Sequence, residues 1–410
     1  MSEEFEYLEE YQHPYSACLN LTDSCSMRCI YCFVQQQPNF MTFQVAKDGV
    51  DWLAANLNWW REYTHDPQFK GSITYFGGEP TLMWDEIIVP LTAYIKETYP
   101  DYFDLTITTN GTLLNEERIK FLYDNQIFPL LSIDGIKEVQ DYNRPMRDGS
   151  SGFDKLIEVI PTLLYYFPYT TFRSTVHADT VQYLFDSYLF AEQMNFKNIF
   201  WGINHRVQWK QDQLKELNNQ LNKIFIYRIL NYMNNEPMIT SGQIDKVFQS
   251  IISTYQEKTN SLISRNASRC GLGTTSLSIG YDGSLIGCQE QTSRDTRDKF
   301  YLGNIYQDID KEKHIKLLKE YTKPAIEHSN VFNSKECSDC ICRKYCNTSI
   351  CPSVGQDLYN SFFIKPLSQC VFDKILFNNC ITTLKFLLDE EDNKLFQTYL
   401  DELVEEMISK

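Results

Sequence analysis

The cysteines constrain this chain more than any other feature of its sequence. There are 13 in 410 residues, and ten of them fall into two groups with short internal spacings. Three lie at Cys25, Cys29 and Cys32, and seven of the eight from Cys270 to Cys370 form the second group, with Cys342 left over. The chain starts with an acidic stretch that has neither the basic head nor the apolar core of a signal peptide. Cysteines that are not exported stay reduced, so their spacing points to metal binding rather than to disulfides.

The composition limits the partners. The 38 Lys and Arg against 54 Asp and Glu give a formal net charge of −16, which argues against nucleic acid because phosphate binding needs clustered basic side chains. No apolar run is long enough to span a membrane. Hydrophobic (43%) and charged (22%) residues occur at ordinary globular frequencies, which excludes a disordered or collagen-like chain. We therefore expect a soluble, cytoplasmic protein with no nucleic-acid or membrane partner.

A strand-then-helix pattern repeats six times in the first half of the chain. Hydrophobic patterning predicts strands at 15–22, 72–76, 104–109, 128–132, 170–177 and 198–203. Helical periodicity follows each strand, at 42–63, 84–98, 115–125, 152–167, 181–193 and 211–234. Six alternating units predict an α/β fold with a parallel sheet, a partial (β/α)6 barrel of the TIM type. Its site should lie where the strands end.

The pattern changes after about residue 235. We predict a barrel domain at 1–235, a bridging region at 236–265, a cysteine-rich domain at 266–385 and a C-terminal helix at 386–410. In the cysteine-rich domain, Asp282-Gly283 separates two short apolar runs, 277–279 and 284–286, as in a β-hairpin. Residues 393–410 carry apolar side chains at helical spacing, and we expect this helix to pack on the core.

Cys25, Cys29 and Cys32 have the spacing CX3CX2C on the loop that follows the first predicted strand. Three thiolates on one tight loop can hold three corners of a cubane iron–sulfur cluster and leave one iron open. A tetrahedral zinc site is the alternative, with Cys18 as its fourth ligand. Cys18 lies inside the predicted strand, seven residues before Cys25, which argues against zinc.

This motif, together with Tyr31 before its last cysteine and Gly77-Gly78-Glu79-Pro80 after the second strand, resembles the radical S-adenosylmethionine (SAM) superfamily. The resemblance implies that Cys25, Cys29 and Cys32 hold a [4Fe–4S] cluster whose open iron binds SAM. It also implies a cofactor site at successive strand ends, formed by Tyr31, Gly77, Gly78, Glu79, Asn110, Ser132, Asp134 and Arg144. Taken singly, the Gly-Gly pair and Asn110-Gly111 are also compatible with ordinary tight turns.

The later cysteines resemble the SPASM domain. Cys270, Gly283 and Cys288 have that domain's spacing, and are followed by Cys337-X2-Cys340-X5-Cys346-X4-Cys351 and a lone Cys370. One departure is the four residues, rather than three, before Cys351. The resemblance implies two auxiliary [4Fe–4S] clusters, a distal one held by Cys337, Cys340, Cys346 and Cys370 and an inner one held by Cys270, Cys288 and Cys351. The inner cluster would have an open iron, for which Cys342 is a rival ligand. Two zinc sites are the alternative for these seven cysteines.

The resemblance implies an enzyme in which a reduced cluster cleaves SAM and the resulting 5′-deoxyadenosyl radical takes hydrogen from a peptide residue. The leading hypothesis is a maturase of a ribosomally made precursor peptide that installs a crosslink, a thioether from a Cys sulfur. The first alternative is an anaerobic sulfatase-maturating type of enzyme that oxidises Cys or Ser to formylglycine. The second is an iron–sulfur or zinc module without catalysis. A flavodoxin-type reductase is the expected electron donor.

The sequence assigns no catalytic residue. His177 and His205 follow the fifth and sixth predicted strands, and Glu290 lies two residues after Cys288, so each is a candidate for proton transfer. Hydrogen-bonded structural histidines and a solvated carboxylate are the alternatives. Related sulfatase-maturating enzymes carry an acid directly after the corresponding cysteine, where this chain has Gln289.

Overall fold

The six predicted strand and helix pairs are all present in the computed structural model, which describes residues 8–257, 270–319, 340, 342, 351–360 and 366–388. The strands are β1 (Ser16–Thr22), β2 (Gly71–Gly77), β3 (Phe103–Thr109), β4 (Ile127–Leu131), β5 (Thr171–Val176) and β6 (Asn198–Ile203). The helices that follow them are α1 (Phe43–Tyr63), α2 (Val89–Thr98), α3 (Glu116–Asp124), α5 (Gly152–Tyr166), α6 (Leu184–Gln193) and α7 (Gln211–Met233). The predicted α/β fold class is confirmed.

The chain divides into two compact units, which are described separately. The first comprises residues 1–133, 140–170 and 270–323, and the second comprises 134–139, 171–269 and 324–410, each as far as the chain is described. The domain boundaries expected at residues 235, 265 and 385 stay a prediction.

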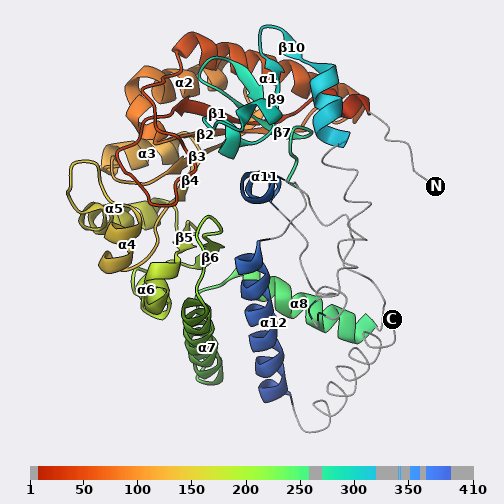
Figure 1. Cartoon of the computed structure of the whole chain (residues 1–410). Coiled ribbons are helices and arrows are strands. Elements are labelled where there is room, and N and C mark those ends of the chain that lie inside the picture. The colour runs from red at the N-terminus through yellow and green to blue at the C-terminus, as the bar shows by residue number, and fades with distance from the viewer. Residues whose placement is uncertain are drawn as a thin grey trace. The chain divides into compact units, whose positions relative to one another are not determined.

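The first unit contains an eight-stranded sheet in the order β10-β9-β8-β7-β1-β2-β3-β4. Strands β1 to β4 are parallel, and β7 lies parallel to β1 on its other side. The antiparallel end of the sheet is formed by β7 (Ser276–Ile279), β8 (Ser284–Ile286), β9 (Tyr301–Asn304) and β10 (Asp308–Ile309). The predicted hairpin at Asp282-Gly283 is thus confirmed, and it joins the sheet directly beside β1 (Figure 1).

Burial and helix capping explain why the parallel strands end at a common edge. Leu19, Ile73 and Ile107 are fully buried and fix the register of neighbouring strands. Thr42, Asn115 and Ser151 each accept the backbone N–H of the residue three positions later, so α1, α3 and α5 begin at defined points after the strands. The loops between these points carry most of the predicted site residues.

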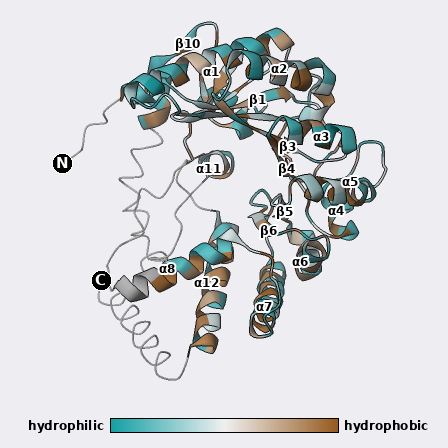
Figure 2. Ribbon diagram, turned by 180° about the vertical axis from the view of Figure 1, so that it is seen from behind, coloured by the Kyte–Doolittle hydropathy of each residue, from teal (hydrophilic) through white to brown (hydrophobic). Residues whose placement is uncertain are grey.

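The second unit contains β5 and β6, which pair in parallel from Thr171 opposite Asn198 to Val176 opposite Ile203. Three further helices belong to it: α8 (Gly242–Glu257), α11 (Pro352–Tyr359) and α12 (Leu367–Leu387). Helix α12 is rich in hydrophobic residues (Figure 2) and packs against α7 and α8. Helix α8 lies in the bridging region predicted at 236–265, whereas the helix expected at 393–410 lies outside the described residues.

The structure differs from the sequence prediction at short elements. The segment predicted as one helix from 84 to 98 follows a 3-10 turn, η2 (Pro80–Met83), and begins with a π turn, η3 (Trp84–Ile88). Pro90 has no N–H to continue the α-helical pattern, which accounts for the irregular start. The short helix α4 (Lys137–Asn143) and strands β9 and β10 were not predicted, nor were η1 (Glu9–Gln12), η4 (Ala178–Tyr183), η5 (Gln289–Gln291) and η6 (Arg297–Lys299). Among the described helices, none is both long and apolar enough to cross a membrane.

Candidate active site

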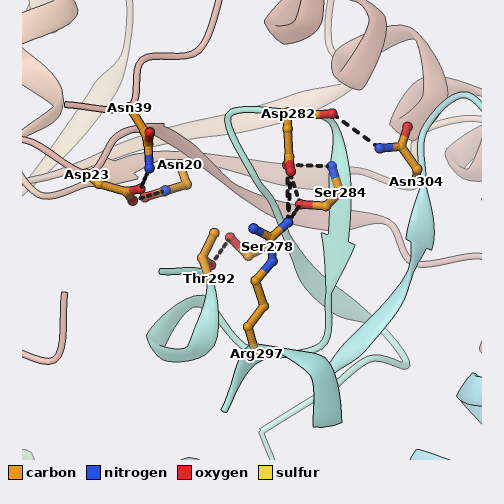
Figure 3. A network of polar contacts seen from close by, with 9 residues as sticks. All are labelled: Asn20, Asp23, Asn39, Ser278, Asp282, Ser284, Thr292, Arg297 and Asn304. Carbon is orange, nitrogen blue, oxygen red and sulfur yellow. Dashed lines mark hydrogen bonds and ion pairs between the residues drawn. The ribbon is translucent and has the colours of Figure 1, made fainter. Parts of the chain in front are cut away.

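The three cysteines of CX3CX2C lie on a loop that is closed at its base by Asp23. The carboxylate of Asp23 accepts hydrogen bonds from Asn20 Nδ2 (2.8 Å) and Asn39 Nδ2 (2.9 Å), as Figure 3 shows. The Asp23 backbone N–H also donates to the Asn39 carbonyl (3.1 Å). Asp23 is only 2% exposed, so these bonds are shielded from water and strengthened accordingly. The loop therefore starts and ends at one fixed point after β1.

A second clamp holds the middle of the cysteine loop. The backbone N–H groups of Arg28 and Ile30 donate to carbonyls in the segment 143–147, and the N–H of Arg147 donates back to the Ser26 carbonyl. This exchange forms a short antiparallel contact between the loop and the segment that precedes α5. It fixes the backbone on which the cysteines are carried.

Arg144 and Tyr31, two of the residues predicted for the cofactor site, are brought together by this contact. The guanidinium carbon of Arg144 lies 5.3 Å from the centre of the Tyr31 ring. Arg144 is 9% exposed, so the cation is largely removed from water. A cation over an aromatic face is electrostatically favourable, and the pair places a positive charge beside the cysteine loop.

Gly77 and Gly78 allow the loop to approach β2 closely. The Gly78 N–H donates to the Thr22 carbonyl (2.7 Å), and the Glu79 N–H donates to the Ser24 carbonyl (2.9 Å). A Cβ on Gly78 would lie 2.3 Å from the Ser24 carbonyl oxygen, and one on Gly77, whose φ is +137°, would lie 2.3 Å from the Thr22 carbonyl oxygen. The glycines are therefore required by the backbone contact, not merely by a turn.

Glu79 is 1% exposed and both of its carboxylate oxygens accept hydrogen bonds. Oε1 accepts from the Thr81 N–H (3.1 Å), the Thr81 hydroxyl (2.5 Å) and the Thr109 hydroxyl (2.7 Å). Oε2 accepts from the Asn110 N–H (2.8 Å). Burial raises the pKa of Glu79, and these bonds oppose the rise. The side chain thus ties the end of β2 to the end of β3.

Asn110 extends this tie to the cysteine loop. Its Oδ1 accepts from the Thr112 N–H (3.0 Å) and the Thr112 hydroxyl (2.7 Å). Its Nδ2 donates to Ser26 Oγ (3.1 Å) and to Cys25 Sγ (3.7 Å). These contacts of Asn110 were not predictable from the sequence, because its partners lie 84 and 85 residues earlier in the chain.

The three thiols differ in burial. Cys25 is buried and packs with Met27 and Met146, Cys29 is half-buried and Cys32 is exposed. Burial raises the pKa of Cys25 to about 12, and the nearby Glu79 carboxylate adds to the rise. Without a cation the Cys25 thiol therefore keeps its proton, while a bound metal would remove it.

Three cysteines on one loop are the donor set that a cubane cluster takes. In the described part of the chain, no three Cys, His, Asp or Glu side chains are grouped so as to hold a metal ion. A cubane takes its thiolates at separate corners, which are spaced more widely than the donors around one ion, and three cysteines on one clamped loop supply that set. Cys18, the fourth ligand of the zinc alternative, lies in β1 as expected.

Ser132 and Asp134 follow β4. The Ser132 N–H donates to the Thr109 carbonyl (2.9 Å), so Ser132 is tied to the end of β3. Asp134 belongs to the second unit, where its Oδ1 accepts from the Thr175 N–H (2.8 Å) and its carbonyl accepts from the Ser174 hydroxyl (2.9 Å). The structure therefore anchors Asp134 to β5.

The three candidates for proton transfer lie in different surroundings. His177 is 4% exposed, its Nδ1 accepts from the Asp179 N–H (3.1 Å), and burial lowers its pKa. The neutral ring therefore carries its proton on Nε2 and can donate there. The His205 Nδ1 pairs with the Ser368 hydroxyl (3.1 Å). Glu290 is half-buried in η5, two residues after Cys288.

Cys270 and Cys288 flank the β7–β8 hairpin, and segments next to them come near each other. Gly273, three residues after Cys270, packs against Gly287, which directly precedes Cys288: a Cβ on Gly273 would lie 3.7 Å from the Gly287 Cα. The hairpin thus brings together two segments that the sequence assigned to one cluster.

Polar contacts hold this hairpin in place (Figure 3). The Thr292 hydroxyl donates to Ser278 Oγ in β7 (3.0 Å). Arg297 in η6 donates to the Asp282 carboxylate at the turn (3.0 Å), which also accepts the Ser284 N–H (3.1 Å). The segment that carries Cys288 is therefore attached to the sheet at two points.

The described cysteines from Cys340 to Cys370, Cys342 included, belong to the second unit. Cys351 directly precedes α11, Cys370 lies in the first turn of α12, and Cys342 is 4% exposed. Cys340 is half-buried. Cys337 and Cys346 lie outside the described residues.

Comparison with known proteins decides the family. Residues 19–189, which carry the cysteine loop and the strand ends described above, match the family model of the Radical SAM superfamily. They form a radical SAM domain. The family expected from CX3CX2C and Gly77-Gly78-Glu79 is thereby confirmed.

The similarity to curated proteins extends beyond that domain. The radical SAM cyclopropyl synthase TigE of Paramaledivibacter caminithermalis is 23% identical over 94% of this chain and 76% of its own length. A cysteine-type anaerobic sulfatase-maturating enzyme of Clostridium perfringens is 24% identical over 69% of this chain and 75% of its own length. Two other curated relatives match over only 42% and 47% of their own lengths.

A solved structure shares the fold. Native anSMEcpe with bound AdoMet and Cp18Cys peptide matches with a TM-score of 0.68 at 20% identity, over 92% of this chain and 100% of that chain. At this identity the match shows the common fold. It covers the part of the chain after the barrel as well as the radical SAM domain.

Proposed function

We propose that this chain is a radical SAM peptide maturase in which Cys25, Cys29 and Cys32 hold a [4Fe–4S] cluster. The observation that carries the proposal is the cysteine loop, which the Gly78 and Glu79 amides hold on one side and the segment 143–147 holds on the other. A loop fixed from two sides presents its thiolates in a set geometry, as a cluster site requires.

The same elements supply a site for SAM. The guanidinium of Arg144 suits the SAM carboxylate, because planar donors pair well with carboxylates. The Gly77-Gly78-Glu79 segment supplies acceptors for the ammonium group, Tyr31 an aromatic face for adenine and Ser132 a hydroxyl for the ribose. Asn110 and Asp134 complete the proposed residues of the cofactor site.

We propose two auxiliary clusters, held as the SPASM resemblance implies. Cys270, Cys288 and Cys351 form the inner ligand set, and the packing of Gly273 on Gly287 supports the pairing of the first two. Cys337, Cys340, Cys346 and Cys370 form the distal set. Three ligands leave one iron of the inner cluster able to bind a substrate thiolate, since soft thiolates suit iron.

The proposed reaction joins a Cys sulfur of a precursor peptide to a carbon of another residue. Reductive SAM cleavage, the chemistry that the bound cofactors supply, removes one hydrogen atom from that carbon. The C–S bond forms as the thiol proton leaves to solvent and one electron passes to an acceptor of the iron–sulfur or flavin class. A flavodoxin-type reductase supplies the electron for SAM cleavage. The product therefore has two hydrogens fewer than the precursor.

Formylglycine formation is the second candidate function, and the similarity to a sulfatase-maturating enzyme favours it. Gln289 follows Cys288 where those enzymes carry an acid, which favours the crosslink. Of the proton-transfer candidates, His177 can donate from Nε2, while His205 is engaged with Ser368. Glu290 remains a candidate base beside the inner ligand set.

The peptide product distinguishes these reactions. Anaerobic turnover with a Cys-containing precursor is expected to give a peptide lighter by two hydrogens that resists thiol alkylation after reduction. Mass spectrometry with a deuterated acceptor carbon is expected to show the label in 5′-deoxyadenosine. An aldehyde in place of the Cys side chain would establish formylglycine formation. Loss of two hydrogens with the thiol still reactive would establish a carbon–carbon bond, as in a cyclopropyl ring.

Iron content tests the ligand sets. Cys288→Ala is expected to remove about one third of the iron, because one cubane of three is lost. Cys342→Ala is the matched control: this buried thiol lies outside the proposed sets, so iron and turnover should stay near wild type. Iron and acid-labile sulfide are measured on anaerobically purified protein. Loss of a whole cluster in Cys342→Ala would make it the fourth ligand, and stoichiometric zinc would contradict the cluster assignment.

A further inference from the structure

We infer that Asn110 raises the reduction potential of the cluster at Cys25, Cys29 and Cys32 by donating an N–H group to the Cys25 sulfur. The inference rests on the proposed function, because it needs a cluster on that loop. It assigns Asn110 a positioning and tuning role in addition to its proposed place in the cofactor site. The contacts of its amide group carry the argument.

The orientation of the Asn110 amide is fixed by its partners. The backbone N–H of Thr112 can only donate, and it lies 3.0 Å from Oδ1, so the oxygen must face Thr112. The nitrogen then faces the cysteine loop, 3.1 Å from Ser26 Oγ and 3.7 Å from Cys25 Sγ. The large radius of sulfur makes N···S bonds longer than N···O bonds. A flipped amide would set two N–H groups against each other.

A closed ring of hydrogen bonds keeps the amide in this place. Asn110 Nδ2 donates to Ser26 Oγ, Ser26 Oγ pairs with Thr112 Oγ1 (3.1 Å), and Thr112 Oγ1 donates to Asn110 Oδ1 (2.7 Å). Each member of such a ring polarises the next. The second N–H of the amide is thereby directed to Cys25.

Glu79 fixes the backbone from which the amide extends. Its Oε2 accepts the Asn110 N–H (2.8 Å), and its Oε1 accepts the Thr109 hydroxyl (2.7 Å), whose oxygen in turn accepts the Gly111 N–H (3.0 Å). All three residues at the end of β3 are therefore held by one buried carboxylate. Glu79 thus places the Asn110 amide that faces Cys25.

The expected direction follows from charge. A cluster gains negative charge on reduction, so an N–H donor at a thiolate stabilises the reduced form more than the oxidised form. Asn110 is 6% exposed and Cys25 is 9% exposed, so water does not substitute for the lost donor easily. Removing the donor therefore lowers the reduction potential.

The test measures the reduction potential by anaerobic redox titration in the absence of SAM. The readout is the EPR signal that changes when SAM is added afterwards. Asn110→Ala is expected to reduce the equilibrium constant for reduction about tenfold, a fall of about 59 mV for a one-electron couple. Thr112→Val breaks the ring but keeps the amide, and should shift the potential less in the same direction. Asn56→Ala is the matched control, since Asn56 is equally buried but bonds to His13 and Trp52.

The outcomes separate the inference from the proposed function. An unchanged potential in Asn110→Ala, with weaker SAM binding, would overturn the inference and make Asn110 a cofactor ligand. If Asn110→Ala binds no iron, its potential cannot be measured, and Thr112→Val becomes the deciding variant. An unchanged reduction potential in Thr112→Val would then overturn the inference. Wild-type protein with no SAM-sensitive EPR signal would instead overturn the proposed function.

Discussion

Replacing Gly78 by alanine is expected to abolish SAM cleavage and to remove the cluster on the cysteine loop. The added Cβ would lie 2.3 Å from the Ser24 carbonyl oxygen and 2.9 Å from that of Asp23. Both contacts are with backbone, which cannot rotate away as a side chain can. The loop must move, and the Gly78 and Glu79 amides then lose their acceptors at Thr22 and Ser24.

The energetic cost is large for one methyl group. Forced overpacking costs about 1–3 kcal/mol, and two backbone hydrogen bonds are lost in addition. The loop carries all three proposed ligands of the first cluster, so the displacement acts on the whole site. Iron per chain and 5′-deoxyadenosine formation measure the result, with about a third of the iron expected to be lost.

Gly242→Ala provides the control for this substitution. Gly242 lies at the start of α8, nothing lies within 4 Å of a Cβ there, and its backbone is not left-handed. It should keep wild-type iron and activity. If Gly78→Ala also keeps wild-type iron and activity, the glycine pair is not required for the close approach of the loop to β2.

The strands were predictable because their signals are local. All six barrel strands lie within one or two residues of their predicted bounds, since alternating burial and flanking turn residues both mark them. The hairpin was predictable for the same reason, from Asp282-Gly283 alone. Helix α4 has only seven residues, too few to show a clear periodicity, and β10 has two.

The contacts within the site were not predictable from spacing. Asp23 and Asn39 carry no motif, although they close the cysteine loop, because the bond between their side chains joins positions 16 residues apart. The sequence identified Gly77-Gly78, but as a cofactor contact. The hydrogen bonds from the Gly78 and Glu79 amides to the loop exist only because β2 approaches the end of β1. The Asn110 ring depends on residues from two strand ends.

These contacts share one design. Each strand end in the first unit is bonded to the next: the cysteine loop to β2 through backbone amides, β2 to β3 through Glu79, and β3 back to the loop through Asn110. Such a closed circuit fixes the ligands before any cofactor binds, and pre-organisation reduces the cost of binding. Its most buried member is the Glu79 carboxylate.

Glu79→Gln is therefore expected to lower stability sharply despite its nearly identical shape. Both carboxylate oxygens accept from backbone amides, Oε1 from Thr81 and Oε2 from Asn110, and a backbone N–H cannot become an acceptor. Whichever way the glutamine amide turns, its NH2 group faces one of these donors. An unsatisfied buried pair costs about 1–3 kcal/mol for each group, so a fall of roughly 3 kcal/mol in the free energy of unfolding is expected.

The thermal unfolding midpoint, compared with that of Glu86→Gln, measures this effect. Glu86 is exposed in η3, so its substitution should leave the midpoint unchanged. Glu79→Gln acts on the cluster potential in two opposed ways, because it disturbs Asn110 and also removes a negative charge near Cys25, so the midpoint and not the potential tests the role of Glu79. Equal midpoints for the two glutamine variants would contradict the role of Glu79 as the centre of the circuit.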